Sequence, residues 1–256
     1  MEGSVKHDSP EGKKITKSIL NMINLNDQQF LGIIVAVGVI ILTLILLKLW
    51  VSRKSARRSV LLLGLCDAGK TRIWSQLIHG RHVGTHTSIK ENIDDYQTNK
   101  GMLKIVDIPG HERLRFRFLD QYKSATRAFI FVVDALTFQK DIRDVAEYLY
   151  TVLTDSAVMS ANPSVLILAH KQDQPMAKGC ALLQANLERE LNVLRQTKDK
   201  QLDSLSDKEN SSSYLGKHGK DFTFAHLNPL RVEFGETSAE DSLGLEPIKK
   251  WLASLG

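Results

Sequence analysis

The sequence has few cysteines, and the two that it has, Cys66 and Cys180, lie far apart in the chain. Cys66 falls inside a glycine-rich loop, so a disulfide framework is not expected, which fits a reducing compartment such as the cytosol. The chain also lacks zinc-site spacings and any recognisable nucleic-acid-binding module. Its net charge of +5 is concentrated in one short basic run at residues 53–58, so we expect no direct nucleic-acid partner.

Charged residues are absent from Phe30 to Leu47, and with the next four residues this apolar run is long enough to cross a bilayer. The run is too long for a signal peptide and is not followed by a small-residue cleavage site, and the start of the chain lacks a myristoylation signal. A buried core helix of this length would show a polar face, and this run has none. We therefore predict a single transmembrane helix at residues 30–51.

Basic residues are missing between Lys17 and this apolar run, whereas several follow it at once. The positive-inside rule then places the C-terminal part of the chain in the cytosol and the short N-terminal part across the membrane. The basic run can also contact anionic lipid headgroups. We therefore expect four parts, which are a lumenal segment 1–29, the span 30–51, a juxtamembrane linker 52–58 and a cytosolic domain 59–256.

Strand-like and helix-like runs alternate through residues 59–256. The expected strands are Ser59–Leu63, Asn92–Thr98, Met102–Asp107, Ala128–Val133, Val165–Ala169, Phe222–Leu227 and Leu230–Phe234. The expected helices are Thr71–His79, Leu114–Ala125, Phe138–Thr154, Met176–Arg195 and Leu245–Leu255. Residues 196–220 are charged and serine-rich without an apolar period, so we expect a mobile insertion there. Buried strands separated by helices indicate an α/β fold, a mainly parallel sheet with helices on both faces.

The segment Gly64–Thr71 has the pattern of a phosphate-binding loop, G-x-x-x-x-G-K-[ST], between a strand and a helix. Its glycines allow tight turns, and its backbone N–H groups and the positive end of the helix point at an anion. Lys70 can reach the β- and γ-phosphates, and the Thr71 hydroxyl can ligate Mg²⁺. The candidate nucleotide-binding residues here are Gly64, Leu65, Cys66, Asp67, Ala68, Gly69, Lys70, Thr71 and Arg72.

Two further stretches can complete the phosphate and metal site. In Asp107-Ile-Pro-Gly110-His111, which follows a strand, Asp107 can hold Mg²⁺ through water and Gly110 can donate its N–H to a γ-phosphate. His111 can orient an attacking water. The polar loop 81–90 supplies further nucleotide-site candidates, and one hydroxyl there can complete the Mg²⁺ coordination. Those candidates are Thr85, His86, Thr87 and Ser88, with Thr87 and Ser88 as the alternative metal ligands and Ser88 preferred.

Two stretches are suited to a purine base. His170-Lys171-Gln172-Asp173 follows a buried strand, and the Asp173 carboxylate can accept two hydrogen bonds from the N1–H and N2–H₂ edge of guanine. Adenine lacks this paired donor edge, so the site would select guanine. The Lys171 stem can pack along the purine face. In Thr237-Ser238-Ala239, the backbone N–H of Ala239 can reach the base carbonyl.

Taken in this order, these motifs resemble those of small GTPases of the Ras and Arf superfamily, over about residues 59–256. With the preceding apolar span, the motifs GLCDAGKT, DIPGHE, FVVDA and HKQD resemble the family of signal recognition particle receptor β subunits. The resemblance implies a P-loop GTPase fold that binds GTP or GDP with Mg²⁺. It also implies GTP-dependent docking of the receptor α subunit at the endoplasmic reticulum, for co-translational protein targeting.

The same resemblance implies that the α subunit docks on the switch loops, which by position are residues 81–90 and 110–125. Arg113, Arg115 and Arg117 alternate in the second loop and are candidates for that surface. Four positions depart from the superfamily pattern, and one of them, filled by Gly in Ras, is Asp67 or Ala68 here, depending on the alignment. His170 replaces the usual Asn, His111 replaces the Gln that orients water, and Glu240 follows Ala239 where Lys is frequent.

We expect slow GTP hydrolysis without a partner, because His111 replaces Gln and no arginine finger is identifiable in the sequence. Two alternatives to the GTP switch stay open. One is a constitutively GTP-bound structural anchor with little turnover. The other is an Arf-like trafficking regulator that carries a membrane span.

Overall fold

The computed structural model describes residues 27–81, 84, 87–204, 214–240 and 242–255. The chain divides into two compact units, Met1–Ser55 and Ala56–Gly256. The described part of the first unit lies in helix α2, which runs over Asp27–Ala56. Every strand and every other helix of the described residues belongs to the second unit.

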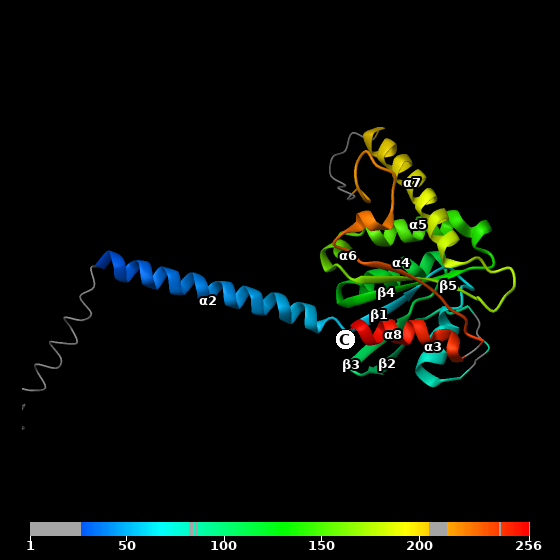
Figure 1. The fold of residues 1–256 in the computed structure, drawn as a ribbon, viewed down its shortest axis with the longest axis horizontal. Helices are drawn as coiled ribbons and strands as arrows, with labels where there is room; N and C mark the ends of the chain where they lie inside the picture. The colour runs from blue at the N-terminus through cyan, green and yellow to red at the C-terminus, as the bar shows by residue number, and fades with distance from the viewer. Residues whose placement is uncertain (1–26, 82–83, 85–86, 205–213, 241, 256) are drawn as a thin grey trace, which may run out of the picture. The chain divides into compact units, whose positions relative to one another are not determined.

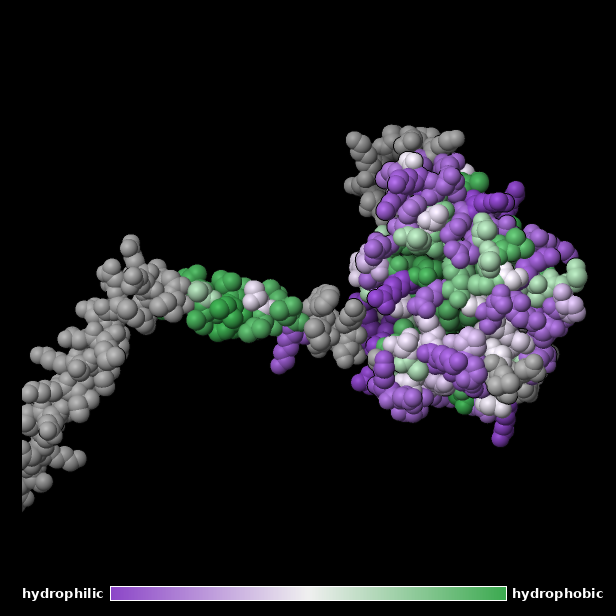
Figure 2. All heavy atoms as spheres, viewed as in Figure 1, coloured by the Kyte–Doolittle hydropathy of each residue, from purple (hydrophilic) through white to green (hydrophobic). Residues whose placement is uncertain are grey.

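Helix α2 contains the long apolar run of the sequence. Its large apolar side chains between Ile34 and Leu47 are exposed, and Figure 2 shows them as a continuous hydrophobic band. A search of the described residues finds no helix that is both long enough and apolar enough to cross a membrane. The span at residues 30–51 therefore stays a prediction.

The second unit is built on a six-stranded sheet in the order β2-β3-β1-β4-β5-β6. The strands are β1 (Ser59–Leu63), β2 (Asn92–Thr98), β3 (Gly101–Asp107), β4 (Thr126–Asp134), β5 (Ser164–His170) and β6 (Val232–Glu236). Neighbouring strands are parallel except at one edge, where β2 and β3 form an antiparallel hairpin. The expected α/β fold with a mainly parallel sheet is confirmed.

Helices cover both faces of this sheet (Figure 1). The α-helices are α3 (Lys70–His79), α4 (Glu112–Tyr122), α5 (Phe138–Thr154), α6 (Ser156–Ala161), α7 (Cys180–Ser204) and α8 (Glu246–Leu255). Because side chains alternate along a strand, Leu61 and Leu63 of β1 join the core that contains α4, α5 and α7. Val60 and Leu62 join a second core with α3 and α8. Because β3, β1, β4, β5 and β6 are parallel, their carboxyl ends lie along one edge of the sheet.

Short 3₁₀ helices complete the unit, and they are η1 (Lys123–Ala125), η2 (Phe224–Leu227) and η3 (Ser242–Leu245). The predicted strand at 222–227 is wrong, because its end forms η2. Phe222 and Phe224 alternate as inward residues of a strand would, but their rings pack edge to face at 5.2 Å within the core.

Helix α7 is longer than predicted. It continues past Arg195 to Ser204, so the first part of the stretch 196–220 is helical. Arg195 itself is buried, and its guanidinium donates to the carbonyl oxygens of Leu215, Lys217 and Lys220, which fastens the segment after the helix onto it. The apolar period could not reveal this extension, because the added turns are polar.

Candidate nucleotide-binding site

The phosphate loop, Gly64–Thr71, is wedged between the ends of neighbouring strands. Gly64 has φ +142°, and a Cβ there would lie 2.2 Å from the carbonyl oxygen of Val132 in β4. Gly110 follows β3, and its Cβ would lie 2.6 Å from the backbone nitrogen of Cys66. Side chains are therefore excluded at both positions, and the Asp107–Gly110 stretch lies directly against the loop.

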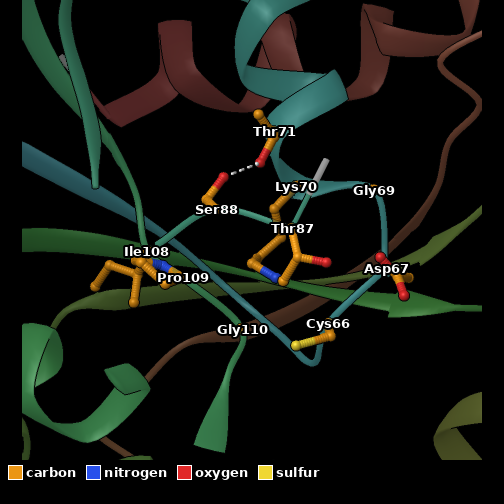
Figure 3. Close-up of a pocket in the computed structure, with 10 residues that line it drawn as sticks. All are labelled: Cys66, Asp67, Gly69, Lys70, Thr71, Thr87, Ser88, Ile108, Pro109 and Gly110. Carbon is orange, nitrogen blue, oxygen red and sulfur yellow. Dashed lines mark hydrogen bonds between the residues drawn. The ribbon is translucent and has the colours of Figure 1, made fainter. Parts of the chain in front are cut away.

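Among the described residues, no side chain caps the N-terminus of helix α3, which begins within this loop. Gly69 is its N-cap and makes no side-chain hydrogen bond, and the first turn holds no acidic residue. The free N–H groups and the positive end of the helix dipole thus favour an anion here. Ten residues line the adjoining phosphate pocket, namely Cys66, Asp67, Gly69, Lys70, Thr71, Thr87, Ser88, Ile108, Pro109 and Gly110 (Figure 3).

Lys70 lies across the phosphate loop instead of extending into solvent. Its side chain is buried, and its Nζ donates to the carbonyl oxygen of Leu65 at 2.6 Å. Burial lowers the pKa of this ammonium, and the negative charge of Asp107 opposes that shift. The cation is therefore held inside the concave side of the loop, where phosphate oxygens would lie.

A cluster of oxygen atoms surrounds the end of β3. The Thr71 hydroxyl donates to Asp107 Oδ2 at 2.7 Å and lies 3.2 Å from the Ser88 hydroxyl, as Figure 3 shows for the latter pair. Asn92 also donates to Asp107 Oδ2, at 2.9 Å. Asp107 is fully buried, and burial raises the pKa of its carboxyl group against the effect of these hydrogen bonds. Its other oxygen, Oδ1, has no hydrogen-bond partner among the described residues.

The polar loop and the candidate water-orienting residue are only partly placed at this pocket. Thr85 and His86 lie outside the described residues, whereas Thr87 and Ser88 line the pocket. His111 is exposed and is not among the described residues that line it. Its Nδ1 accepts the backbone N–H of Arg113 at 3.3 Å, so the imidazole caps the start of α4.

His170, at the end of β5, joins the phosphate loop to the last motif. It is buried, and its Nδ1 lies 3.0 Å from the Thr237 hydroxyl. On the other side the ring rests against Gly69, where a Cβ would approach Cδ2 to 2.5 Å. Burial, followed by the nearby Lys171 charge, lowers the pKa of His170 to about 4. The imidazole is therefore neutral at physiological pH.

A second pocket, the base pocket, adjoins the first at Gly69. Its lining residues are Gly69, Arg72, Leu136, His170, Lys171, Asp173, Gln174, Ala239 and Glu240. Asp173 accepts hydrogen bonds from the Ser238 hydroxyl at 2.8 Å and from Gln174 at 2.6 Å. Although burial acts in the opposite direction, these hydrogen bonds hold the pKa of the Asp173 carboxyl below its usual value. The base pocket therefore presents an ionised carboxylate beside the phosphate loop.

Comparison with known proteins assigns the chain to a family. A family model described as "Signal recognition particle receptor beta subunit" matches residues 55–231. The signal recognition particle receptor subunit beta of Homo sapiens is 44% identical over 238 residues, which cover 90% of this chain and 88% of that protein. The chain belongs to the family of signal recognition particle receptor β subunits.

Solved structures of this family share the fold. A chain in "The Structure of the Mammalian SRP Receptor" is 44% identical with a TM-score of 0.69, over 78% of this chain and 100% of that one. The signal recognition particle receptor SRb-GDP-Mg from Chaetomium thermophilum is 25% identical with a TM-score of 0.60, over 78% of this chain and 98% of that one. The resemblance drawn from the motifs is thus confirmed at the level of family and fold.

Several residues of this β-subunit site were not found by motif reasoning. Asn92 holds the Asp107 carboxylate, Thr237 holds His170, and Asp134 pairs with Lys171 at 2.7 Å. For Asn92 a signal existed, because the hairpin register pairs it directly with Asp107. The Lys171 ammonium is held by the Asp134 carboxylate at the end of β4.

One expectation about the family's partner surface is wrong. Arg115 does not lie on an exposed face of α4, because its guanidinium is buried over the Tyr148 ring at 4.6 Å from the ring centre. Arg113 and Arg117 are exposed. An alternating pattern suits one face of a strand, whereas helical residues two positions apart point in different directions.

Proposed function

We propose that this chain is a GTP-binding switch that serves as the β subunit of the signal recognition particle receptor and holds the α subunit at the endoplasmic reticulum. Family membership supports the receptor role over that of an Arf-like trafficking regulator. The observation that carries the nucleotide claim is the buried Asp107 carboxylate. One of its oxygens has no hydrogen-bond partner in the described part of the chain, and the other accepts from Thr71 at the end of the phosphate loop.

The residues present fit a magnesium ion. Mg²⁺ prefers oxygen ligands and keeps several of its waters. In our proposal the hydroxyls of Thr71 and Ser88 would hold it directly, and Asp107 Oδ1 would hold it through water. When bound, the ion neutralises charge on the nucleotide phosphates. The relative from Chaetomium thermophilum, whose name includes GDP and Mg, supports this assignment.

Guanine would be recognised in the base pocket by Asp173, whose carboxylate accepts from the paired donors of guanine but meets no such pair in adenine. The Ser238 hydroxyl holds one oxygen of that carboxylate in place. His170 would take the position of the usual Asn by linking the phosphate loop with the base motif. Lys171 would lie along the purine, and the Ala239 N–H would reach the base carbonyl.

In this proposal His111 would assist GTP hydrolysis. Its side chain would leave its capping position on α4 and orient the attacking water. Contact of the γ-phosphate with the Gly110 N–H would order the start of α4. Residues 81–90 and 110–125 would then form the surface that holds the α subunit, with Arg113 and Arg117 exposed on it. A ligand shifts such a switch only through differential contacts, and the γ-phosphate supplies them.

The switch can be tested by loading the full chain, in detergent, with GTP or with GDP and measuring capture of the receptor α subunit. We expect capture from the GTP-loaded protein at least tenfold tighter than from the GDP-loaded protein. Equal capture in both states would favour the constitutive anchor instead. His111→Ala then separates the two roles. If the chain is a GTP switch, this substitution should prolong α-subunit binding in a single-turnover experiment. If hydrolysis and targeting are both unchanged, the constitutively GTP-bound anchor is supported.

We also propose that residues 30–51 span the endoplasmic reticulum membrane once, with residues 1–29 in the lumen and the basic linker 52–58 at the cytosolic surface. The charge-free run Phe30–Leu47 within α2 and the charge asymmetry around it support this topology. The basic linker would also attract anionic lipid headgroups. Alkaline extraction of membranes should leave the full chain in the pellet and release a chain that lacks residues 1–56. Release of both chains would contradict the proposed membrane span.

A further inference from the structure

The base pocket is bounded on one side by an ion pair that connects the two halves of the site. Arg72 lies in the first turn of α3, and Glu240 lies in the loop after β6. Arg72 Nη2 and Glu240 Oε1 are 2.7 Å apart, and both residues line the base pocket. The pair therefore links the helix that follows the phosphate loop to the last motif of the chain.

The loop held by this pair also orients the carboxylate that would recognise guanine. The backbone N–H of Glu240 donates to the Ser238 hydroxyl at 3.1 Å, and that hydroxyl donates to Asp173 Oδ1 at 2.8 Å. Movement of Glu240 away from α3 would therefore pull on the hydroxyl that fixes the Asp173 carboxylate. The pair and the carboxylate are mechanically connected through two hydrogen bonds.

The sign of the charge at position 240 is what makes this contact attractive. A basic residue there would instead place a like charge opposite Arg72. The contact involves one end of the Arg72 guanidinium. Its Nη2 atom pairs with Glu240, while the buried Nε has no hydrogen-bond partner among the described residues. Arg72 therefore contacts the loop after β6 through this terminal nitrogen.

We infer that Arg72 and Glu240 form a clasp beside the bound base that slows release of guanine nucleotide. The inference rests on the proposed guanine site and deepens it. A base that occupies the pocket lies next to both residues, so its departure is easier when the clasp opens and the loop at 237–240 separates from α3. The clasp acts by position, and neither residue takes part in hydrolysis.

The expected effect is moderate and depends on salt. The two side chains are 36% and 50% exposed, and ion pairs of this exposure are weakened by water and ions. Loss of the pair should therefore speed release roughly two- to fivefold at low salt. At 1 M salt the screening length is about 3 Å, so the difference between clasped and unclasped protein should largely disappear.

The test uses the full chain in detergent, loaded with N-methylanthraniloyl-GDP and chased with excess GDP at fixed Mg²⁺. Glu240→Gln removes the charge without changing the size of the side chain. Glu246→Gln is the matched control, because Glu246 forms an ion pair of similar exposure with Lys249 at 3.0 Å in α8, and it does not line the base pocket. Release is measured at 50 mM and 1 M KCl.

We expect Glu240→Gln to speed release at 50 mM KCl and to match the wild type at 1 M, with Glu246→Gln unchanged throughout. Arg72→Gln should speed release as much as Glu240→Gln does, and the double variant should release no faster than either single variant, because all three lose the same ion pair. Unchanged or slower release in Glu240→Gln overturns the clasp, and slower release would mean that a freed Arg72 binds the nucleotide itself. A wild-type chain that retains no fluorescent GDP overturns the guanine site itself.

Discussion

Gly69 is the position where the phosphate and base halves of the site touch, and its replacement by alanine tests that contact. Gly69 and Gly80 cap the two ends of α3, and both have left-handed backbone conformations, with φ +93° and +63°. A Cβ at Gly69 would lie 2.5 Å from Cδ2 and 2.7 Å from Nε2 of His170, whereas a Cβ at Gly80 meets no atom of the described residues within 4 Å. Gly80→Ala is therefore a control that carries the backbone strain without the collision.

The size of each effect follows from these contacts. An L-residue in a left-handed conformation costs about 1–2 kcal/mol, which both substitutions share. Forcing extra atoms into a packed site costs about 1–3 kcal/mol more, and His170 cannot easily move because it is buried and bonded to Thr237. We therefore expect Gly80→Ala to lower the free energy of unfolding by about 1–2 kcal/mol and Gly69→Ala by about 2–5 kcal/mol.

The measurement is urea unfolding of residues 56–256 without nucleotide, followed by circular dichroism. Adding His170→Ala should reduce the cost of Gly69→Ala to that of the backbone strain alone, because the ring that the Cβ meets is gone. Equal costs for the two glycine substitutions, or a Gly69→Ala cost that His170→Ala does not reduce, would refute the proposed contact between the phosphate loop and His170.

Three further predictions concern single residues. Lys70→Ala should weaken GTP binding by about 10- to 100-fold, the range that a charge-assisted hydrogen bond supplies, as an equilibrium titration would report. Because the pKa of His170 falls from 6.5 to about 4 on folding, the folded state binds fewer protons between these values. Stability should therefore be full above pH 6.5 and fall by about 3 kcal/mol as the pH drops to 4, and His170→Asn should flatten this dependence in urea unfolding curves. Asp107→Asn should release GDP at the rate that the wild type shows in EDTA, and added Mg²⁺ should not slow it; continued slowing by Mg²⁺ would contradict the metal role of this carboxylate.

The sheet and most of its helices could be predicted because the sequence carries strong local signals. The buried strands around Phe131 and Ile167 are continuous apolar runs, and helix α5 has a clear apolar period, so Phe138–Thr154 was predicted at its observed bounds. The short helix α6 has no such period. Its start is stabilised by Asp155, whose side chain accepts hydrogen bonds from the backbone N–H groups of Ala157 and Val158. This single capping residue is a weak sequence signal for a helix of only six residues.

Spacing alone predicted most of the residues that line the two pockets, but it did not predict their hydrogen-bond partners. The sequence indicates that Asp107 ends a strand, whereas the lack of a partner for its Oδ1 among the described residues depends on which residues surround it. The Arg72–Glu240 pair joins residues distant in the chain, so it depends on the tertiary fold and has no signal in local sequence spacing. Arg115 was misplaced because its alternation with Arg113 and Arg117 suggested a shared exposed surface, whereas aromatic rings bury its guanidinium.

The central claim is that this chain holds a guanine nucleotide between its phosphate loop and its base pocket. The most direct test is to purify the full chain from membranes in detergent with Mg²⁺ present, denature it, and identify the released nucleotide by chromatography. We expect GTP or GDP in near-stoichiometric amount, and loss of both from a Lys70→Ala chain purified in parallel. Release of ATP, or of no nucleotide even after incubation with excess GTP, would contradict the account.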